Sequence, residues 1–215
     1  MPTLPSEPIP ADEFLEEFVP AAFAELAGDR RLPETDLALG FRLVGAGGGD
    51  WIYRVADGAL AVESGDREAA TLSVVQSVAD WRGALWEGRG GIFGRVATGV
   101  LSGSAFAAIR DAAGDREPNL EALEPIRALD GLVRVVLAGD EGGDWSLAIR
   151  LGPGAIPAEP SATVTIQAED AAAIERGELD PLTAFMAGRV EVIGDMTLVL
   201  QMQAVLMQAL MPPPG

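Results

Sequence analysis

Residues 161–195 have the sequence SATVTIQAEDAAAIERGELDPLTAFMAGRVEVIGD, and this stretch decides the fold. Side chains alternate in residues 163–167, which predicts a β-strand. A helix is expected over residues 169–176, and a second, short helix over residues 181–187. Residues 190–192 place a glutamate between two valines and predict another strand. This stretch therefore combines strands and helices.

Proline, glycine and aspartate residues mark where these elements begin and end. Pro181 suits the first turn of a helix, where its missing N–H costs nothing. Gly188 can adopt the positive φ that ends a helix, and Arg189 suits the negative end of the helix dipole. Gly194 allows a sharp turn, so that Asp195 can cap the next helix. These residues therefore have structural roles, and none of these roles is catalytic.

The same stretch resembles the sterol carrier protein 2 family. In that family a strand is followed by a helix that ends in a Gly-x-Leu-x-Pro turn. An aromatic and a small residue then precede Gly-Lys/Arg, a strand, and a Gly-Asp pair that opens the last helix. The residues that fill these places here are Gly177, Leu179, Pro181, Phe185, Gly188, Arg189, Gly194 and Asp195. The resemblance covers residues 130–211. It implies an α+β fold, in which a curved five-stranded sheet covered by helices encloses an apolar tunnel for a sterol, a fatty acyl chain, acyl-coenzyme A or a phospholipid.

The closing segment, Met196–Met211, is apolar on nearly all sides, so neighbouring elements must cover it. It holds four of the six methionines, whose flexible side chains suit a pocket that accepts several ligand shapes. Alternatively, the methionines fill an irregular core, or the helix packs on the other half of the chain. The resemblance implies that this helix lines the tunnel. The residues that we expect to line it are Phe185, Met186, Val192, Met196, Val199, Met202 and Leu206.

The first half of the chain repeats features of the second half. Gly-Gly-Asp-Trp occurs at residues 48–51 and 142–145, and residues 70–74 match residues 162–166 at nearly the same separation. The shared order predicts an internal duplication, and the alternative is coincidence between two glycine turns. The first copy is degenerate, because residues 86–90 (WEGRG) replace the Gly-x-Leu-x-Pro turn and the Gly-Asp pair is missing.

These observations predict three parts. Residues 1–10 form a flexible leader, residues 11–114 a degenerate sterol-carrier-like unit, and residues 119–211 a sterol-carrier-like lipid-binding unit. We expect each unit to be a curved, mostly antiparallel sheet of about five strands covered by helices. Gly, Asp, Pro and Asn gather in residues 114–119 and predict the linker.

The composition argues against several kinds of chemistry. The chain has 33 acidic and 15 basic residues, a net charge of −18, and no run of basic residues for a phosphate backbone, so we expect no nucleic acid partner. It has no histidine and no cysteine, and so lacks the usual general base and any thiolate metal ligand. The glycine cluster at residues 45–49 lacks the Gly-Lys-Ser/Thr ending of a phosphate loop. We therefore expect a non-enzyme without catalytic residues, metal or cofactor.

The sequence also gives expectations for where the protein is located and what it binds. Residues 1–10 lack the features of a signal peptide, and glutamines interrupt the longest apolar segment, so we expect a cytoplasmic protein without stable membrane insertion. Its expected partner is a hydrophobic small molecule. One alternative is an accessory protein with a filled tunnel that docks on a partner enzyme. Another is a carboxylate-dependent isomerase or cyclase of an apolar substrate, which a deeply buried Asp or Glu facing a pocket would favour.

Overall fold

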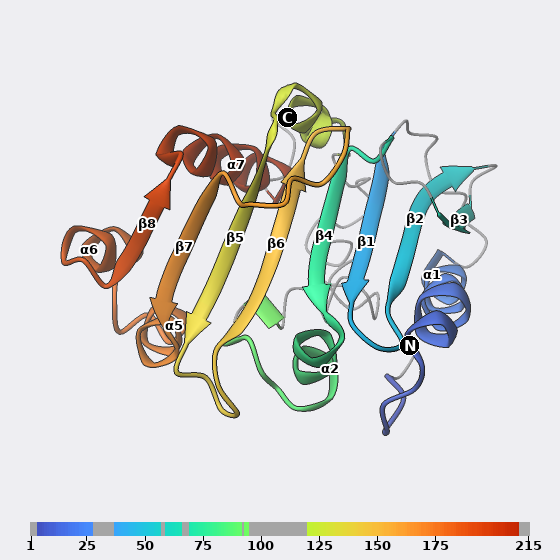
Figure 1. The fold of residues 1–215 in the computed structure, drawn as a ribbon, viewed down its shortest axis with the longest axis horizontal. Coiled ribbons are helices and arrows are strands. Elements are labelled where there is room, and N and C mark those ends of the chain that lie inside the picture. The colour runs from blue at the N-terminus through green and yellow to red at the C-terminus, as the bar shows by residue number, and fades with distance from the viewer. Residues whose placement is uncertain are drawn as a thin grey trace.

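The computed structural model describes residues 4–27, 37–56, 59–65, 69–91, 93–94 and 120–210. They form a mixed sheet of eight strands in the order β3-β2-β1-β4-β6-β5-β7-β8 (Figure 1). The strands are β1 (Ala38–Val44), β2 (Gly49–Ala56), β3 (Ala59–Ser64), β4 (Leu72–Ser77), β5 (Gly131–Ala138), β6 (Trp145–Leu151), β7 (Ala162–Gln167) and β8 (Val190–Gly194). The helical segments are η1 (Glu13–Phe18), α1 (Val19–Ala27), α2 (Val78–Trp86), η2 (Leu120–Ala128), α5 (Ala168–Glu175), α6 (Pro181–Met186) and α7 (Met196–Leu210).

Each half of the chain contributes the same three connected strands. β1 and β2 form an antiparallel hairpin, and β4 lies parallel to β1. In the second half, β5 and β6 form the hairpin and β7 lies parallel to β5. β4 and β6 pair antiparallel at the centre, where Ser73 lies opposite Arg150. The two halves therefore share one sheet, whereas the sequence suggested a sheet for each unit.

The predicted α+β class is confirmed, and five of the seven strand pairings are antiparallel. The strand order contains two overlapping sets of five, β3-β2-β1-β4-β6 and β4-β6-β5-β7-β8. The two sets have the same sequence of parallel and antiparallel neighbours, and they share β4 and β6. Each half thus completes a five-stranded sheet with a strand of the other half.

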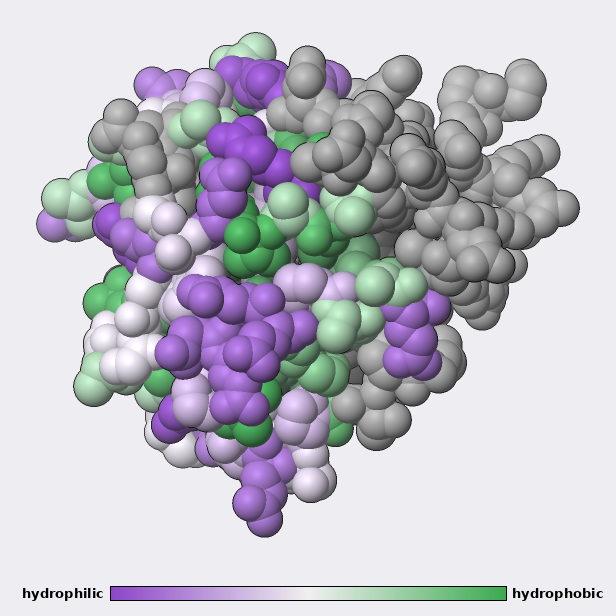
Figure 2. Space-filling model, turned by 90° about the vertical axis from the view of Figure 1, so that its right-hand side faces the viewer, coloured by the Kyte–Doolittle hydropathy of each residue, from purple (hydrophilic) through white to green (hydrophobic). Residues whose placement is uncertain are grey.

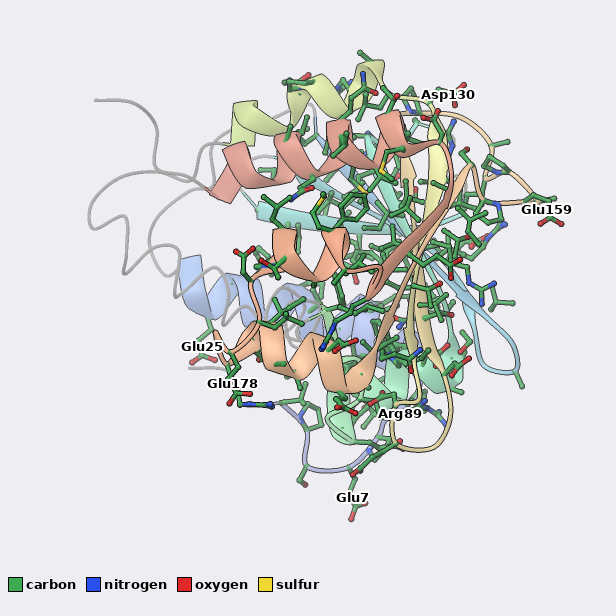
Figure 3. The ribbon with its side chains drawn as sticks, turned by 90° about the vertical axis from the view of Figure 1, so that its left-hand side faces the viewer. Glu7, Glu25, Arg89, Asp130, Glu159 and Glu178 are labelled. Atoms are coloured by element: carbon green, nitrogen blue, oxygen red, sulfur yellow. The ribbon has the colours of Figure 1, made fainter. Side chains whose placement is uncertain are left out.

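The helices α5, α6 and α7 lie on one side of the sheet (Figure 3). In the first half, the covered face packs against an aromatic cluster from η1 and α2. The ring centroids of Phe14 lie 4.9 Å from Phe18, 5.4 Å from Trp81 and 5.6 Å from Trp86. Because aromatic pairs at these separations attract one another and exclude water, this part of the interior is filled.

The opposite face of the sheet carries the loop of residues 152–161, and Arg150 holds that loop. The Arg150 guanidinium is buried and donates to the backbone oxygens of Pro153 and Ala155 at 2.9 and 3.1 Å. It also forms an ion pair with Asp130 at 2.8 Å. A buried guanidinium needs several acceptors of this kind, so Arg150 has a structural role.

Part of the expected leader contacts the core of the first half. Leu4 and Ile9 pack against its apolar cluster, and the indole N–H of Trp86 donates to the backbone oxygen of Pro5 at 2.8 Å. Residues 4–10 are thus held at several points. The expected linker, residues 114–119, lies outside the described residues.

Candidate functional site

The sheet of the second half presents a continuous apolar surface to the helices. Val164 lies opposite Val192 in the β7–β8 pair and next to Val135 in the β5–β7 pair, so the three valines share one face. Val135 is buried, whereas Val164 and Val192 are half-buried. The helix-facing residues of β5 to β8 are Val133, Val135, Leu137, Trp145, Leu147, Ile149, Leu151, Ala162, Val164, Ile166, Val190 and Val192. All of them are apolar, so this face suits contact with hydrocarbon.

The helix α7 covers one end of this surface, and a tight turn places it there. The backbone N–H of Leu198 donates to the Asp195 carboxylate at 3.0 Å, and the Asp195 N–H donates to the Ser161 oxygen at 2.9 Å. Gly194 has a φ of 100°, and a Cβ atom there would lie 2.3 Å from the Ser161 oxygen. Only glycine fits this position, which confirms the structural roles predicted for Gly194 and Asp195.

One side of α7 is packed into a cluster with η2 and the sheet. Leu198, Met202 and Val205 are buried, at spacings of four and three residues that place them on one helix face. Their neighbours in the cluster are Ile126, Val133 and Leu151, and Val199 packs against its margin. Met202, one of the expected lining residues, therefore belongs to a buried cluster of close neighbours.

The other end of the apolar surface is covered by α5 and α2. Leu137, Trp145 and Ile166 form a second cluster there with alanines of both helices. Ile149 packs against both clusters and so lies between them. The half-buried Val164 packs against the α7 cluster, and Val192 lies opposite it in the β7–β8 pair. This stretch of the sheet, between α5 and α7, is the candidate binding surface.

The helix α6 begins at Asp180, whose carboxylate accepts the Thr183 backbone N–H at 2.8 Å. That hydrogen bond, and a second from the Thr183 hydroxyl, hold the pKa of Asp180 below its ordinary value. Pro181 occupies the first turn, as predicted. Ala184 is fully buried and fixes the helix to the rest of the molecule. The following Gly188 has a φ of 71° and ends the helix.

The expected lining residues fall into three groups. Val192, Met196 and Val199 are half-buried; Val192 lies on the candidate surface, Val199 packs against the α7 cluster, and Met202 is buried in that cluster. Phe185 and Met186 of α6 are exposed at the end of the molecule. The side chain of Leu206 lies outside the described residues. Sequence reasoning did not single out Leu198 and Val205, although their spacing to Met202 marks a single helix face.

Carboxylates gather elsewhere, at the N-terminal end. Asp12, Glu13, Glu16 and Glu17, with Pro10, line a shallow depression of about 240 Å³. The Glu16 carboxylate accepts the indole N–H of Trp51 at 2.7 Å. In the described ranges the buried polar side chains are Thr71, Ser73, Gln76 and Arg150, and none is a carboxylate. The described residues thus lack the buried acid that the isomerase alternative requires.

The described residues lack two features, a cluster of metal ligands and a membrane-spanning helix. Those parts of the chain contain no group of acidic side chains placed to hold a metal ion. No helix within them has the length and hydrophobicity to cross a bilayer.

Comparison with known proteins gives a consistent result for the second half. Residues 111–207 match the sequence model described as the SCP-2 sterol transfer family. Hydroxysteroid dehydrogenase-like protein 2 of Xenopus tropicalis is 31% identical over 90 residues, which cover 40% of this chain and 22% of that protein. The protein of the same name from Danio rerio is 28% identical over 85 residues, covering 37% and 20%. The chain spans about a fifth of the length of these curated relatives.

Similar solved structures include the crystal structure of Sterol Carrier Protein 2 Like 2 from Aedes aegypti. It is 22% identical with a TM-score of 0.29, and the match covers 48% of this chain and 94% of that one.

Proposed function

Because residues 111–207 match the sequence model of the SCP-2 sterol transfer family, we propose that they bind a hydrophobic ligand without covalent chemistry and pass it to an acceptor. The ligand class is a sterol, a fatty acyl chain, acyl-coenzyme A or a phospholipid. The observation that carries this proposal is the uninterrupted apolar face of β5 to β8, with Val164 half-buried beside the α7 cluster and Val192 half-buried opposite it.

The binding energy in this proposal comes from burial. Each Å² of apolar surface removed from water contributes about 25 cal/mol, so a long hydrocarbon needs no charged anchor. Val192 forms the floor of the site, and Met196 and Val199 of α7 form its side, with Met202 behind them. Phe185 and Met186 stand at its outer end, on α6.

We propose further that the ligand site belongs to residues 119–211, and that residues 11–114 support it. The supporting observation is the aromatic packing of Phe14, Phe18, Trp81 and Trp86, which occupies the corresponding face of the first half. The two halves repeat the same order of strands, but the first half is filled by aromatic side chains. This combination is expected for a duplication in which one copy has lost the room for a ligand.

The test is native mass spectrometry of the purified chain, followed by extraction and identification of the lipid. We expect a stoichiometric hydrophobic ligand. Val192→Trp should reduce the bound fraction at least tenfold, because the larger ring fills the proposed floor. The matched control is Val136→Trp, at a half-buried valine of β5 on the opposite face of the sheet. An empty wild-type chain that also ignores fluorescent fatty acid and sterol probes would overturn the proposal.

A second candidate is an accessory role beside an enzyme. The matched segment forms only 22% of the Xenopus tropicalis relative, so there it belongs to a longer chain whose name is dehydrogenase-like. In this alternative the chain holds no lipid and a partner enzyme supplies the chemistry. A stable complex with one enzyme, formed by a ligand-free chain, would favour this role over carriage.

A further inference from the structure

The helix α6 exposes three large apolar side chains at one end of the molecule. Leu182 is 68% exposed, Phe185 40% and Met186 78%. We call these three α6 residues the apolar tip. Apolar side chains that gather in this way on a surface mark a contact site.

The apolar tip projects and does not form a groove. In Figure 1, α6 lies outside β8, at one end of the longest axis of the molecule. Ala184 anchors the helix with no exposed area, while the side chains on its outer side are mostly in water. A projecting helix face of this kind can enter a fluid apolar phase, because it needs no matching cavity in its partner.

No excess of positive charge surrounds the apolar tip, because its two neighbouring arginines are paired and the exposed Asp180 and Glu191 add negative charge. Arg189 pairs with Asp170 at 2.8 Å, and Arg176 pairs with Glu178 at 2.7 Å. Residues 181–188 carry no charged side chain in a chain with a net charge of −18. The tip therefore offers no excess of positive charge to anionic headgroups, and its acidic neighbours would be repelled by them.

The opposite end of the molecule is acidic. Exposed Asp12, Glu13, Glu16 and Glu17 lie on and beside η1, at the other end of the longest axis (Figure 1). Figure 2 shows this end, where hydrophilic side chains gather around a smaller hydrophobic area. An acidic end and an uncharged apolar end would orient the molecule at a lipid surface with the acidic end pointing away.

We propose that the apolar tip docks the protein on the surface of a zwitterionic lipid bilayer, by shallow insertion of Leu182, Phe185 and Met186. The inference rests on the proposed function for its purpose, since a carrier must meet the membrane that gives or receives its lipid. Val192 faces the candidate binding surface from β8, and α6 contacts the same strand. Docking at the tip therefore brings that surface close to the bilayer.

The test is flotation of the full chain with phosphatidylcholine vesicles, compared with vesicles that contain phosphatidylserine. We expect binding to phosphatidylcholine and weaker binding as phosphatidylserine is added. Leu182→Asp should lower the bound fraction at least tenfold, whereas Leu182→Met should keep it. Because an acidic residue suits the first turn of a helix, Leu182→Asp should leave the fold intact, and circular dichroism checks this. The control is Val44→Asp, at a 55% exposed valine on β1, and it should bind as the wild type does.

Several results would overturn docking. They are a wild-type chain that does not float with either vesicle, a Leu182→Asp chain that still floats, and a dimer in sedimentation that Leu182→Asp separates. The last result would assign the tip to a second copy of the chain. Native mass spectrometry on the same samples distinguishes the two proposals. A chain that floats but is empty and ignores the fluorescent fatty acid and sterol probes refutes carriage and leaves docking standing, whereas a ligand-loaded chain that never floats refutes docking alone.

Discussion

The indole N–H of Trp145 donates to the backbone oxygen of Asp80 at 2.8 Å. Trp145 begins β6 in the second half, and Asp80 lies in the first turn of α2 in the first half. The Trp145 side chain is fully buried, so this bond lies inside the contact between the halves. Arg89 crosses the same contact, lying 3.6 Å from the Asp140 carboxylate and donating to the Gly143 oxygen at 2.9 Å.

Trp145→Phe should lower the free energy of unfolding by about 1–3 kcal/mol, because it removes the hydrogen bond to Asp80 and leaves a gap where the larger buried ring packed. Urea unfolding monitored by circular dichroism measures the change. Trp86→Phe is the control: its indole makes a bond of the same length to Pro5, but Trp86 is half-exposed and water can replace the lost donor. We expect a smaller effect there. If both variants lose the same free energy of unfolding, the hydrogen bond between the halves contributes no more than the one to Pro5.

Because strand β4 of the first half pairs with strand β6 of the second half, we expect the two halves to unfold together. A fragment of residues 119–211 lacks β4, so the backbone of β6 that faces Leu72 to Val75 loses its partner. Such an edge is open to pairing with other chains. We expect the fragment to aggregate, or to melt well below the full chain, in a thermal scan with light scattering. A soluble fragment with an unchanged melting temperature would mean that the second half folds independently.

Two glycines provide a matched pair for backbone strain. Gly188→Ala should cost about 1–2 kcal/mol, since φ is positive but no atom lies within 4 Å of the added Cβ. Gly194→Ala should cost at least about 2 kcal/mol more, because its Cβ would meet the Ser161 backbone. Thermal denaturation of both variants measures the difference. If the two variants lose the same stability, close packing at Gly194 does not contribute.

The buried hydroxyl of Tyr53 should make the protein less stable at alkaline pH. Burial, and then the nearby charge of Glu16, raise the pKa of the Tyr53 hydroxyl well above its usual value of about 10. Its folded-state pKa exceeds its unfolded value, so its contribution is complete below pH about 10 and is lost as the pH rises further. The chain has one tyrosine, so tyrosinate absorbance reports this group alone. We expect ionisation only together with unfolding.

Tyr53→Phe is the corresponding variant. It removes the hydrogen bond that the Tyr53 hydroxyl donates to the Leu15 oxygen at 2.6 Å, so it should be less stable at neutral pH. Its stability should also fall less steeply above pH 10, because no phenol remains to ionise. A free tyrosine titration near pH 10 in the folded wild type would contradict this account.

Local signals predicted the elements of the second half well. Pro181, Gly188, Gly194 and Asp195 each act on the backbone within a few residues, so their roles follow from the sequence alone. The shared sheet could not be predicted in this way. Pairing of Ser73 with Arg150 joins residues far apart in the chain, and alternation within a strand does not specify which strand lies beside it.

The candidate site shows the same division. The apolar character of α7 predicted a covered helix, and Met202 is buried as that pattern implies. The pattern of Leu182, Phe185 and Met186 has the same helical spacing, yet these side chains face water. Periodicity shows which residues share a helix face, but it does not show whether another element covers that face.

The junction of β4 with β6 also affects solubility. Two separate open sheets would expose four outer strands, whereas the fused sheet that the described residues form has two, β3 and β8. Unpaired strand margins are where proteins polymerise through their backbones, so fusion halves the number of places at which copies could add to one another. A molecule with exposed apolar side chains at one end is less prone to aggregate when it has few unpaired edge strands.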